Sequence, residues 1–157
     1  MTIRKILVEP DKFLRQKSKP VDIVDKDLQT LMDDMLETMY NAPGIGLAAI
    51  QVGVPKRVIV IDLSRDGEEK SPMYFVNPEI VSSSNNDATY EEGCLSVPGQ
   101  FAEIDRPDKC HLKFLDYNGN KKAASNKDII AKQMTNEQIA KAQELSQRCL
   151  DSGYMDC

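Results

Sequence analysis

The chain has 157 residues and a formal net charge of −5, and 41% of its residues are hydrophobic and 29% charged. These values are typical of soluble globular proteins, so they exclude disordered and fibrous classes and predict one domain with a single hydrophobic core. No run of Lys or Arg forms the basic stripe that duplex nucleic acid requires, and no apolar stretch suits a signal peptide or a membrane span. We therefore expect a cytoplasmic protein that contacts neither nucleic acid nor membranes.

The first predicted helix covers residues 25–41, after a short extended segment at residues 5–10. Its apolar residues recur at the spacing of one helix face: Leu28, Leu31, Met32, Met35, Leu36, Met39 and Tyr40. The acidic residues Asp33, Asp34 and Glu37 lie elsewhere on the helix. Asp25 is a suitable N-cap, and the Pro and Gly residues that follow Asn41 favour a turn or an irregular loop there.

The middle of the chain reads as an antiparallel sheet. Two β-branched runs, residues 57–62 and 73–76, predict buried strands that a charged turn at residues 64–70 separates. A further strand is predicted at residues 110–115, followed by a hairpin turn at Asn118-Gly119 and a weak return strand at residues 121–126. The expected fold class is therefore α+β, with a helix before the sheet.

The sequence changes character near Ala123. Thr135 and Gln138 match a capping box, and a narrow apolar stripe predicts a helix that ends before Gly153. The stripe consists of Ile139, Ala142, Leu145, Ser146 and Cys149. Because it offers little large apolar surface, this helix is expected to pack loosely.

Cysteine and histidine limit the possible metal sites. The four cysteines, at positions 94, 110, 149 and 157, include no CxxC pair, so a structural zinc knuckle is not indicated. His111 is the one histidine of the chain, although imidazole is the commonest protein ligand for zinc, iron and nickel. It alternates with apolar residues on a predicted strand and is expected to face solvent.

Two segments have compositions that could carry chemistry. Residues 44–53 combine permissive glycines, small alanines and the amide of Gln51, which could donate to a substrate carbonyl. The same composition also suits a tight turn against a sheet. Residues 91–99 place Cys94 in a glycine-flanked, turn-rich stretch, where it could be a metal thiolate, a nucleophile or a small buried apolar residue.

Taken together, GIGLAAIQVG and EEGCLSVPGQ, in this order, resemble the first two motifs of the peptide deformylase family. The resemblance runs from about residue 6 to residue 119 and includes the first helix, the strand at residues 57–62, residues 75–80 and Arg106-Pro107. It implies an antiparallel α+β domain that a late helix crosses. It also implies metal-dependent removal of the N-formyl group from the initiator methionine of nascent proteins. The implied partners are N-formylmethionyl peptides and the exit region of the ribosome.

The resemblance also implies roles for individual residues. The family binds Fe²⁺, which Zn²⁺ or Ni²⁺ can replace, through a cysteine that Cys94 matches and two histidines of an HExxH helix. Gln51 and the backbone N–H of Leu95 match the groups that hold the oxyanion. The substrate contacts implied by the two motifs are Ile45, Gly46, Gly93 and Leu95.

The third motif of the family is missing, because HExxH should follow the Asn118-Gly119 hairpin and no histidine occurs after His111. The stretch Gln143-Glu144-Leu145-Ser146-Gln147 reproduces its spacing, with Glu144 in the place of the general base. Glutamine amides are poor ligands for zinc or ferrous iron, so a polar helix face is the simpler reading. The sequence therefore predicts an incomplete metal site.

The chain is accordingly divided into an incomplete deformylase-like domain at residues 1–122 and a divergent tail at residues 123–157. The tail resembles the C-terminal end of bacterial tetratricopeptide-like repeat proteins, in which a pair such as Cys149 and Cys157 closes a helix. A gene fusion, a frameshift or an erroneous joining of two sequences could each produce this pattern.

Three functional hypotheses follow. The first is a truncated, inactive or nearly inactive deformylase relative, a pseudoenzyme. The second is an active metallohydrolase whose missing ligands come from Glu91, Glu92, Glu144 or a second chain. The third is a non-catalytic module that binds formylated N-termini or ribosomes.

Overall fold

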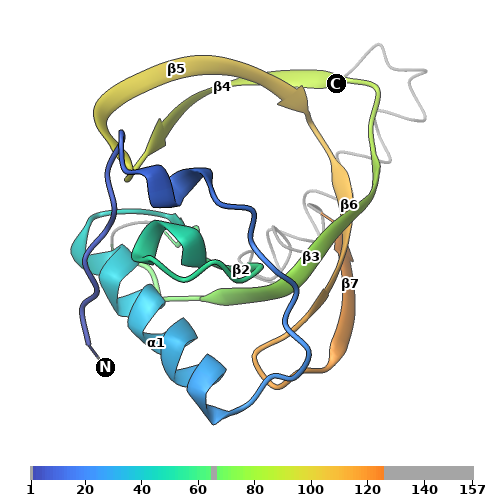
Figure 1. The fold of residues 1–157 in the computed structure, drawn as a ribbon. Coiled ribbons are helices and arrows are strands. Elements are labelled where there is room, and N and C mark those ends of the chain that lie inside the picture. The colour runs from blue at the N-terminus through green and yellow to red at the C-terminus, as the bar shows by residue number, and fades with distance from the viewer. Residues whose placement is uncertain (1, 65–66, 126–157) are drawn as a thin grey trace.

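The computed structural model describes residues 2–64 and 67–125, and it contains one long helix and seven strands within these ranges (Figure 1). The predicted helix is confirmed as α1, Lys26–Asn41, and two short 3₁₀ helices, η1 at Lys12–Arg15 and η2 at Ala49–Val52, stand before and after it. Neither 3₁₀ helix was expected from the sequence. No helix in these two ranges is both long enough and apolar enough to cross a membrane.

Helix α1 buries the face that its apolar spacing predicts. Asp25 is the N-cap, and its side chain accepts a hydrogen bond from the backbone N–H of Leu28. The buried residues of α1 are Leu28, Leu31, Met32, Asp34, Met35, Thr38 and Met39. The apolar members of this set form the core together with residues of the strands. The apolar stripe therefore explains the packing of α1, with the polar exceptions Asp34 and Thr38.

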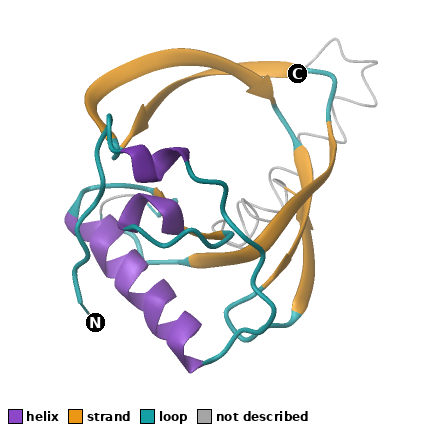
Figure 2. Cartoon of the chain, in the orientation of Figure 1, coloured by secondary structure: helices purple, strands orange, loops and turns teal. Residues whose placement is uncertain are grey.

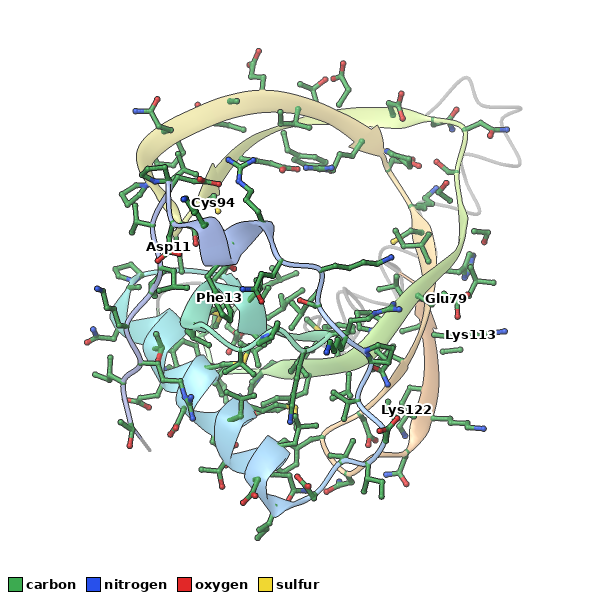
Figure 3. All side chains as sticks on the ribbon, viewed as in Figure 1. Asp11, Phe13, Glu79, Cys94, Lys113 and Lys122 are labelled. Carbon is green, nitrogen blue, oxygen red and sulfur yellow. The ribbon has the colours of Figure 1, made fainter. Side chains whose placement is uncertain are left out.

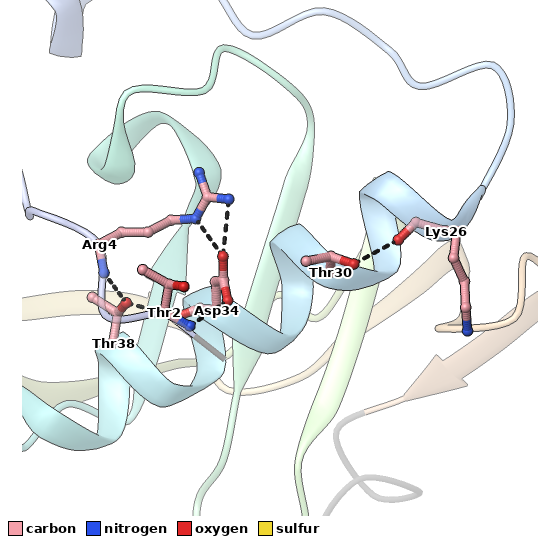
Figure 4. Close-up of polar contacts among 6 residues, drawn as sticks. All are labelled: Thr2, Arg4, Lys26, Thr30, Asp34 and Thr38. Atoms are coloured by element: carbon pink, nitrogen blue, oxygen red, sulfur yellow. Dashed lines mark hydrogen bonds and ion pairs between the residues drawn. The ribbon is translucent and has the colours of Figure 1, made fainter.

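The N-terminal segment explains why Asp34 is buried (Figure 4). One carboxylate oxygen of Asp34 accepts from the backbone N–H of Thr2 at 2.6 Å, and the other accepts from the guanidinium of Arg4 at 3.0 and 3.2 Å. The backbone N–H of Arg4 donates to the Thr38 hydroxyl, which itself donates to the carbonyl of Asp34. The Thr2 bond, with help from Arg4, outweighs the desolvation and holds the pKa of Asp34 below its usual range.

The main sheet has five antiparallel strands in the order β1-β2-β3-β6-β7. Their bounds are Gly46–Ala48, Val58–Ile61, Met73–Ser83, Cys110–Leu115 and Lys121–Ser125. Val58, Val60 and Val76 are buried and belong to the same core as the apolar face of α1. The predicted strands at residues 57–62, 73–76 and 110–115, and the hairpin that leads into β7, are thus confirmed.

Strand β3 is longer than predicted and bends at a bulge. The register with β6 shifts between Val76 and Glu79, and Asn77 has a left-handed backbone with φ 52°. Its side chain accepts from the N–H of Val21 at 2.8 Å and donates to the carbonyl of Val21 at 2.7 Å. Beyond the bulge the side chains of β3 become exposed, so the bulge marks the point where β3 leaves the core.

The second sheet is a long hairpin of β4, Asp87–Cys94, and β5, Val97–Pro107, and nothing in the sequence analysis predicted it. It arches away from β3 and β6 and returns to the N-terminal segment near η1 (Figures 1 and 2). Every side chain of the two strands is exposed or half-buried. A hairpin with two solvated faces has no alternation of apolar and polar residues to reveal it.

The predictions for the C-terminal part of the chain can be compared with the structure only up to Ser125. His111 is exposed on β6, as predicted, and β7 continues to Ser125, past the expected domain boundary at residue 122. The predicted tail helix, its capping box, Glu144 and the proposed cysteine pair all lie outside the described residues. The division into residues 1–122 and 123–157 stays a prediction.

Candidate active site

The loop after α1 forms one wall of the site. Helix α1 ends when the N–H of Ala42 donates to the carbonyls of Thr38 and Met39, and the N–H of Gly44 also donates to Met39. The chain then turns into edge strand β1, where Gly46 pairs with Ile61. This path leaves Ile45 66% exposed at the rim.

Asp62, at the end of β2, anchors this wall. Its N–H donates to the carbonyl of Ile45 at 3.0 Å, and its buried carboxylate accepts from the hydroxyls of Tyr40 and Ser64. Burial acts against the charge of Asp62, but these hydrogen bonds hold its pKa below the usual range. Burial also raises the pKa of Tyr40, which stays a neutral donor to Asp62.

Gln51 lies on η2, directly after β1, and its amide is fixed by three contacts. The Oε1 atom accepts from the N–H of Ala48 at 2.9 Å. The Nε2 atom donates to Oγ of Ser96 at 3.1 Å and faces Sγ of Cys94 at 3.7 Å. Gln51 and Cys94, which are 43 positions apart in the chain and belong to the two recognised motifs, therefore meet in the structure.

The tip of the β4–β5 hairpin forms the opposite wall. Cys94 pairs with Val97, which leaves Leu95 and Ser96 as the two turn residues. The carbonyl of Ser96 accepts from the N–H of Glu9 at 2.9 Å, and the N–H of Leu7 donates to the carbonyl of Gln51. Figure 3 shows Cys94 at this end of the arch, close to the N-terminal segment, whereas Glu79 on β3 and Lys113 on β6 lie across the view from it. The extended segment expected at residues 5–10 forms no strand, but it ties the two motifs together.

Leu95, at the hairpin tip, makes a direct contact with the opposite wall. Its side chain packs against the hydrophobic core, and a Cβ built at Gly44 would lie 2.7 Å from its Cδ1 atom. No side chain fits at position 44 unless Leu95 moves. The second motif therefore reaches the first through a close contact between Leu95 and Gly44.

A groove with a volume of about 1000 Å³ runs between the two walls. Every implied substrate contact, namely Ile45, Gly46, Gly93 and Leu95, lines it together with Gln51 and Cys94. Tyr90 and Phe101, which are 62% and 70% exposed, also line the groove. The sequence analysis missed these two aromatic residues and Ser96, because only the strand register of the hairpin shows where they point.

The described residues do not supply the ligand set of the family's metal site, which is one cysteine thiolate and two histidine imidazoles. Cys94 is a free, exposed thiol, and His111 belongs to β6 in the other sheet. Glu92 lines the groove, but its two oxygens accept from Arg106 at 2.5 and 2.8 Å, which holds the pKa of Glu92 below its usual range. Across residues 2–64 and 67–125, no three His, Cys, Asp or Glu side chains are grouped so that they could hold a metal ion.

A family model described as polypeptide deformylase matches residues 3–138. The chain belongs to the peptide deformylase family. The match continues beyond residue 119, where the recognised motifs end. The peptide deformylase of Pelagibacter ubique strain HTCC1062 is 58% identical over 131 residues, which cover 83% of this chain and 76% of that protein.

Solved structures agree with the fold implied by the family. The peptide deformylase from Ehrlichia chaffeensis in complex with actinonin superposes with a TM-score of 0.75 at 43% identity, over 80% of this chain and 75% of that one. A probable peptide deformylase from Synechococcus phage S-SSM7 gives a TM-score of 0.75 at 39% identity, over 87% of this chain and 92% of that one. The antiparallel α+β fold with an N-terminal helix, expected from the resemblance, is thereby confirmed.

Proposed function

We propose that this protein is a peptide deformylase relative that binds N-formylmethionyl peptides in the groove but removes the formyl group slowly or not at all. The observation that carries the first half is the convergence of Gln51, Cys94 and Leu95 on one groove. Nascent peptides in the cytoplasm, near the exit region of the ribosome, are the proposed partners. In this reading residues 1–122 form the binding domain and residues 123–157 a divergent tail.

Gln51 supplies the polar contact for a formyl carbonyl. One of its two N–H groups is held by the hydroxyl of Ser96, whereas the other faces the sulfur of Cys94 at 3.7 Å. Sulfur is a weak acceptor, so a carbonyl oxygen entering the groove competes for this N–H with advantage. The exposed apolar side chains of Ile45, Tyr90 and Phe101 offer contact area for the side chains of the peptide.

The catalytic half of the proposal rests on donor chemistry. In the family Fe²⁺, or Zn²⁺ or Ni²⁺ in its place, supplies an activated water when it is bound. Cys94 would provide one of its ligands, but a catalytic centre needs about three protein ligands with an orienting set of neighbours. The single histidine of the chain lies on β6, outside the groove, so the proposed role contains no metal-bound nucleophile.

The decisive experiment combines metal analysis, turnover and binding on the same purified full-length chain. Metal content is measured after anaerobic incubation with Fe²⁺ and, separately, with Ni²⁺. Hydrolysis of a formyl-methionyl tripeptide is followed by formate release. Binding of a labelled formylated peptide is compared with binding of the same peptide without the formyl group. We expect substoichiometric metal, formate release at background, and tighter binding of the formylated peptide.

Variants separate the competing hypotheses. Gln51→Met should remove the preference for the formylated peptide, while the exposed Ser82→Ala on β3 serves as a control that changes nothing. Stoichiometric metal and formate release, both lost in Cys94→Ala, would instead establish a metallohydrolase whose other ligands come from Glu91, Glu92, Glu144 or a second chain. Equal binding of the two peptides would refute the binding role.

A further inference from the structure

The side-chain amide of Gln51 uses every hydrogen-bonding atom that it has toward the groove wall. A primary amide carries two N–H donors and one carbonyl acceptor. Here the acceptor faces the N–H of Ala48, one donor faces Ser96, and the second faces Cys94. Only the last of these contacts is weak enough to yield to a ligand.

The orientation of this amide follows from its partners. A backbone N–H cannot accept, so the contact with Ala48 places Oε1 on that side and Nε2 on the side of the hairpin. The Ser96 hydroxyl then fixes the orientation of the amide plane, because it accepts from one of the two N–H groups at 3.1 Å. With that group held, the other N–H points to the space beside Cys94, inside the groove.

Ser96 is itself held rigidly enough for this task. It is 4% exposed, whereas Cys94 and Val97, which flank the turn, are exposed. Its carbonyl accepts from the N–H of Glu9, which docks the hairpin tip on the N-terminal segment. Because the Ser96 hydroxyl is shielded from bulk water, breaking its hydrogen bond with Gln51 would leave a buried polar group without a partner. The contact is therefore expected to persist.

We propose that Ser96 is the positioning residue of the groove: its buried hydroxyl orients Gln51 so that one amide N–H is presented to a formyl carbonyl beside Cys94. This inference rests on the proposed function, since it concerns how the same groove distinguishes a formylated peptide. It assigns Ser96 no contact with the peptide. Its effect passes entirely through Gln51.

The test is a double-mutant cycle read out by peptide binding. Ser96→Ala should weaken binding of the formylated peptide by about fivefold to tenfold, the value of one net hydrogen bond, and leave the unformylated peptide within about twofold. In a Gln51→Met background, Ser96→Ala should have no further effect, because the group through which it acts is gone. Ser82→Ala is the matched control for loss of a serine hydroxyl.

Circular dichroism verifies that each variant folds. If Ser96→Ala does not fold, Ser96→Cys replaces it, since a thiol of similar size is a weaker acceptor and should give a smaller loss of the same kind. Equal weakening of both peptides, or the same loss with and without Gln51, would show that Ser96 only stabilises the hairpin tip and would overturn the inference. A wild type without preference for the formylated peptide would overturn the proposed function and this inference together, so the two failures are distinguishable.

Discussion

The left-handed bulge at Asn77 makes a quantitative prediction about stability. Asn77→Gly removes both hydrogen bonds to Val21 and leaves the backbone free to keep a φ of 52°. Val21 is 8% exposed, so its N–H and carbonyl are poorly placed to find water instead. At about 1 kcal/mol net for each bond, Asn77→Gly should lower the free energy of unfolding by about 2 kcal/mol.

Two further substitutions at this position separate the bonds from the backbone conformation. Asn77→Ala loses the same two bonds and must also hold a residue with a Cβ in the left-handed region, which costs about 1–2 kcal/mol more. Asn77→Asp keeps the oxygen that accepts from Val21, but its second carboxylate oxygen would face the Val21 carbonyl, which Nδ2 now approaches at 2.7 Å, so repulsion between two acceptors should make its cost larger than that of Asn77→Gly. We therefore expect Asn77→Gly to be the least destabilising of the three substitutions, with Asn77→Ala and Asn77→Asp both costing more.

Urea unfolding followed by circular dichroism measures the three costs. With a slope of about 1–2 kcal/mol per molar urea for a domain of this size, Asn77→Gly should lower the midpoint by about 1 M or more. If Asn77→Ala is no less stable than Asn77→Gly, the left-handed backbone carries no strain. A loss below about 0.5 kcal/mol for Asn77→Gly would show that the two hydrogen bonds between Asn77 and Val21 contribute little to the free energy of unfolding.

The remaining predictions concern the groove, the core and pH. Gly44→Ala should force the Leu95 side chain to shift and weaken formylated-peptide binding by about threefold or more, measured beside a thermal unfolding curve, because the added Cβ would lie 2.7 Å from that side chain. Met35→Ala, at a position that is 0% exposed, should cost about 2–5 kcal/mol in urea unfolding, and a smaller cost would mean that the core collapses around it. Cys94→Ala should change the free energy of unfolding by less than about 0.5 kcal/mol, since this thiol is exposed. The lowered pKa of Asp34 means that its contribution to stability is complete above the ordinary aspartate range, near pH 4, and is lost as pH falls through the folded-state pKa, so Asp34→Asn should flatten the loss of stability in acid.

The elements that were predictable from sequence are those that bury one face. Helix α1 and strand β2 carry apolar residues at the correct spacing, and Asp25 marks the start of the helix with its side chain. The return strand β7 was expected from the Asn118-Gly119 turn, which the structure contains with φ 79° at Gly119. Each of these signals is local, so a short stretch of sequence contains it.

The elements that were not predictable depend on distant partners. Asp34 looked like a surface residue of α1, and only the return of Thr2 and Arg4 to its carboxylate makes burial favourable. The β4–β5 hairpin is solvated on both faces and has no apolar period. Only the family motifs could indicate that Gln51 and Cys94 belong to one site, because no spacing rule relates positions 43 residues apart.

The two walls of the groove differ in local stability, because one of them is the β4–β5 hairpin. Gln51 stands on the side of the packed core, whereas Cys94 and Ser96 belong to a hairpin whose strands bury no side chain. Segments with few buried apolar contacts open by local unfolding at a lower free energy than the core does. Amide protons of the hairpin should therefore exchange with solvent well before those of α1. A peptide that touches both walls would slow exchange mainly in the hairpin strands, since the buried Ser96 already holds the tip against the N-terminal segment.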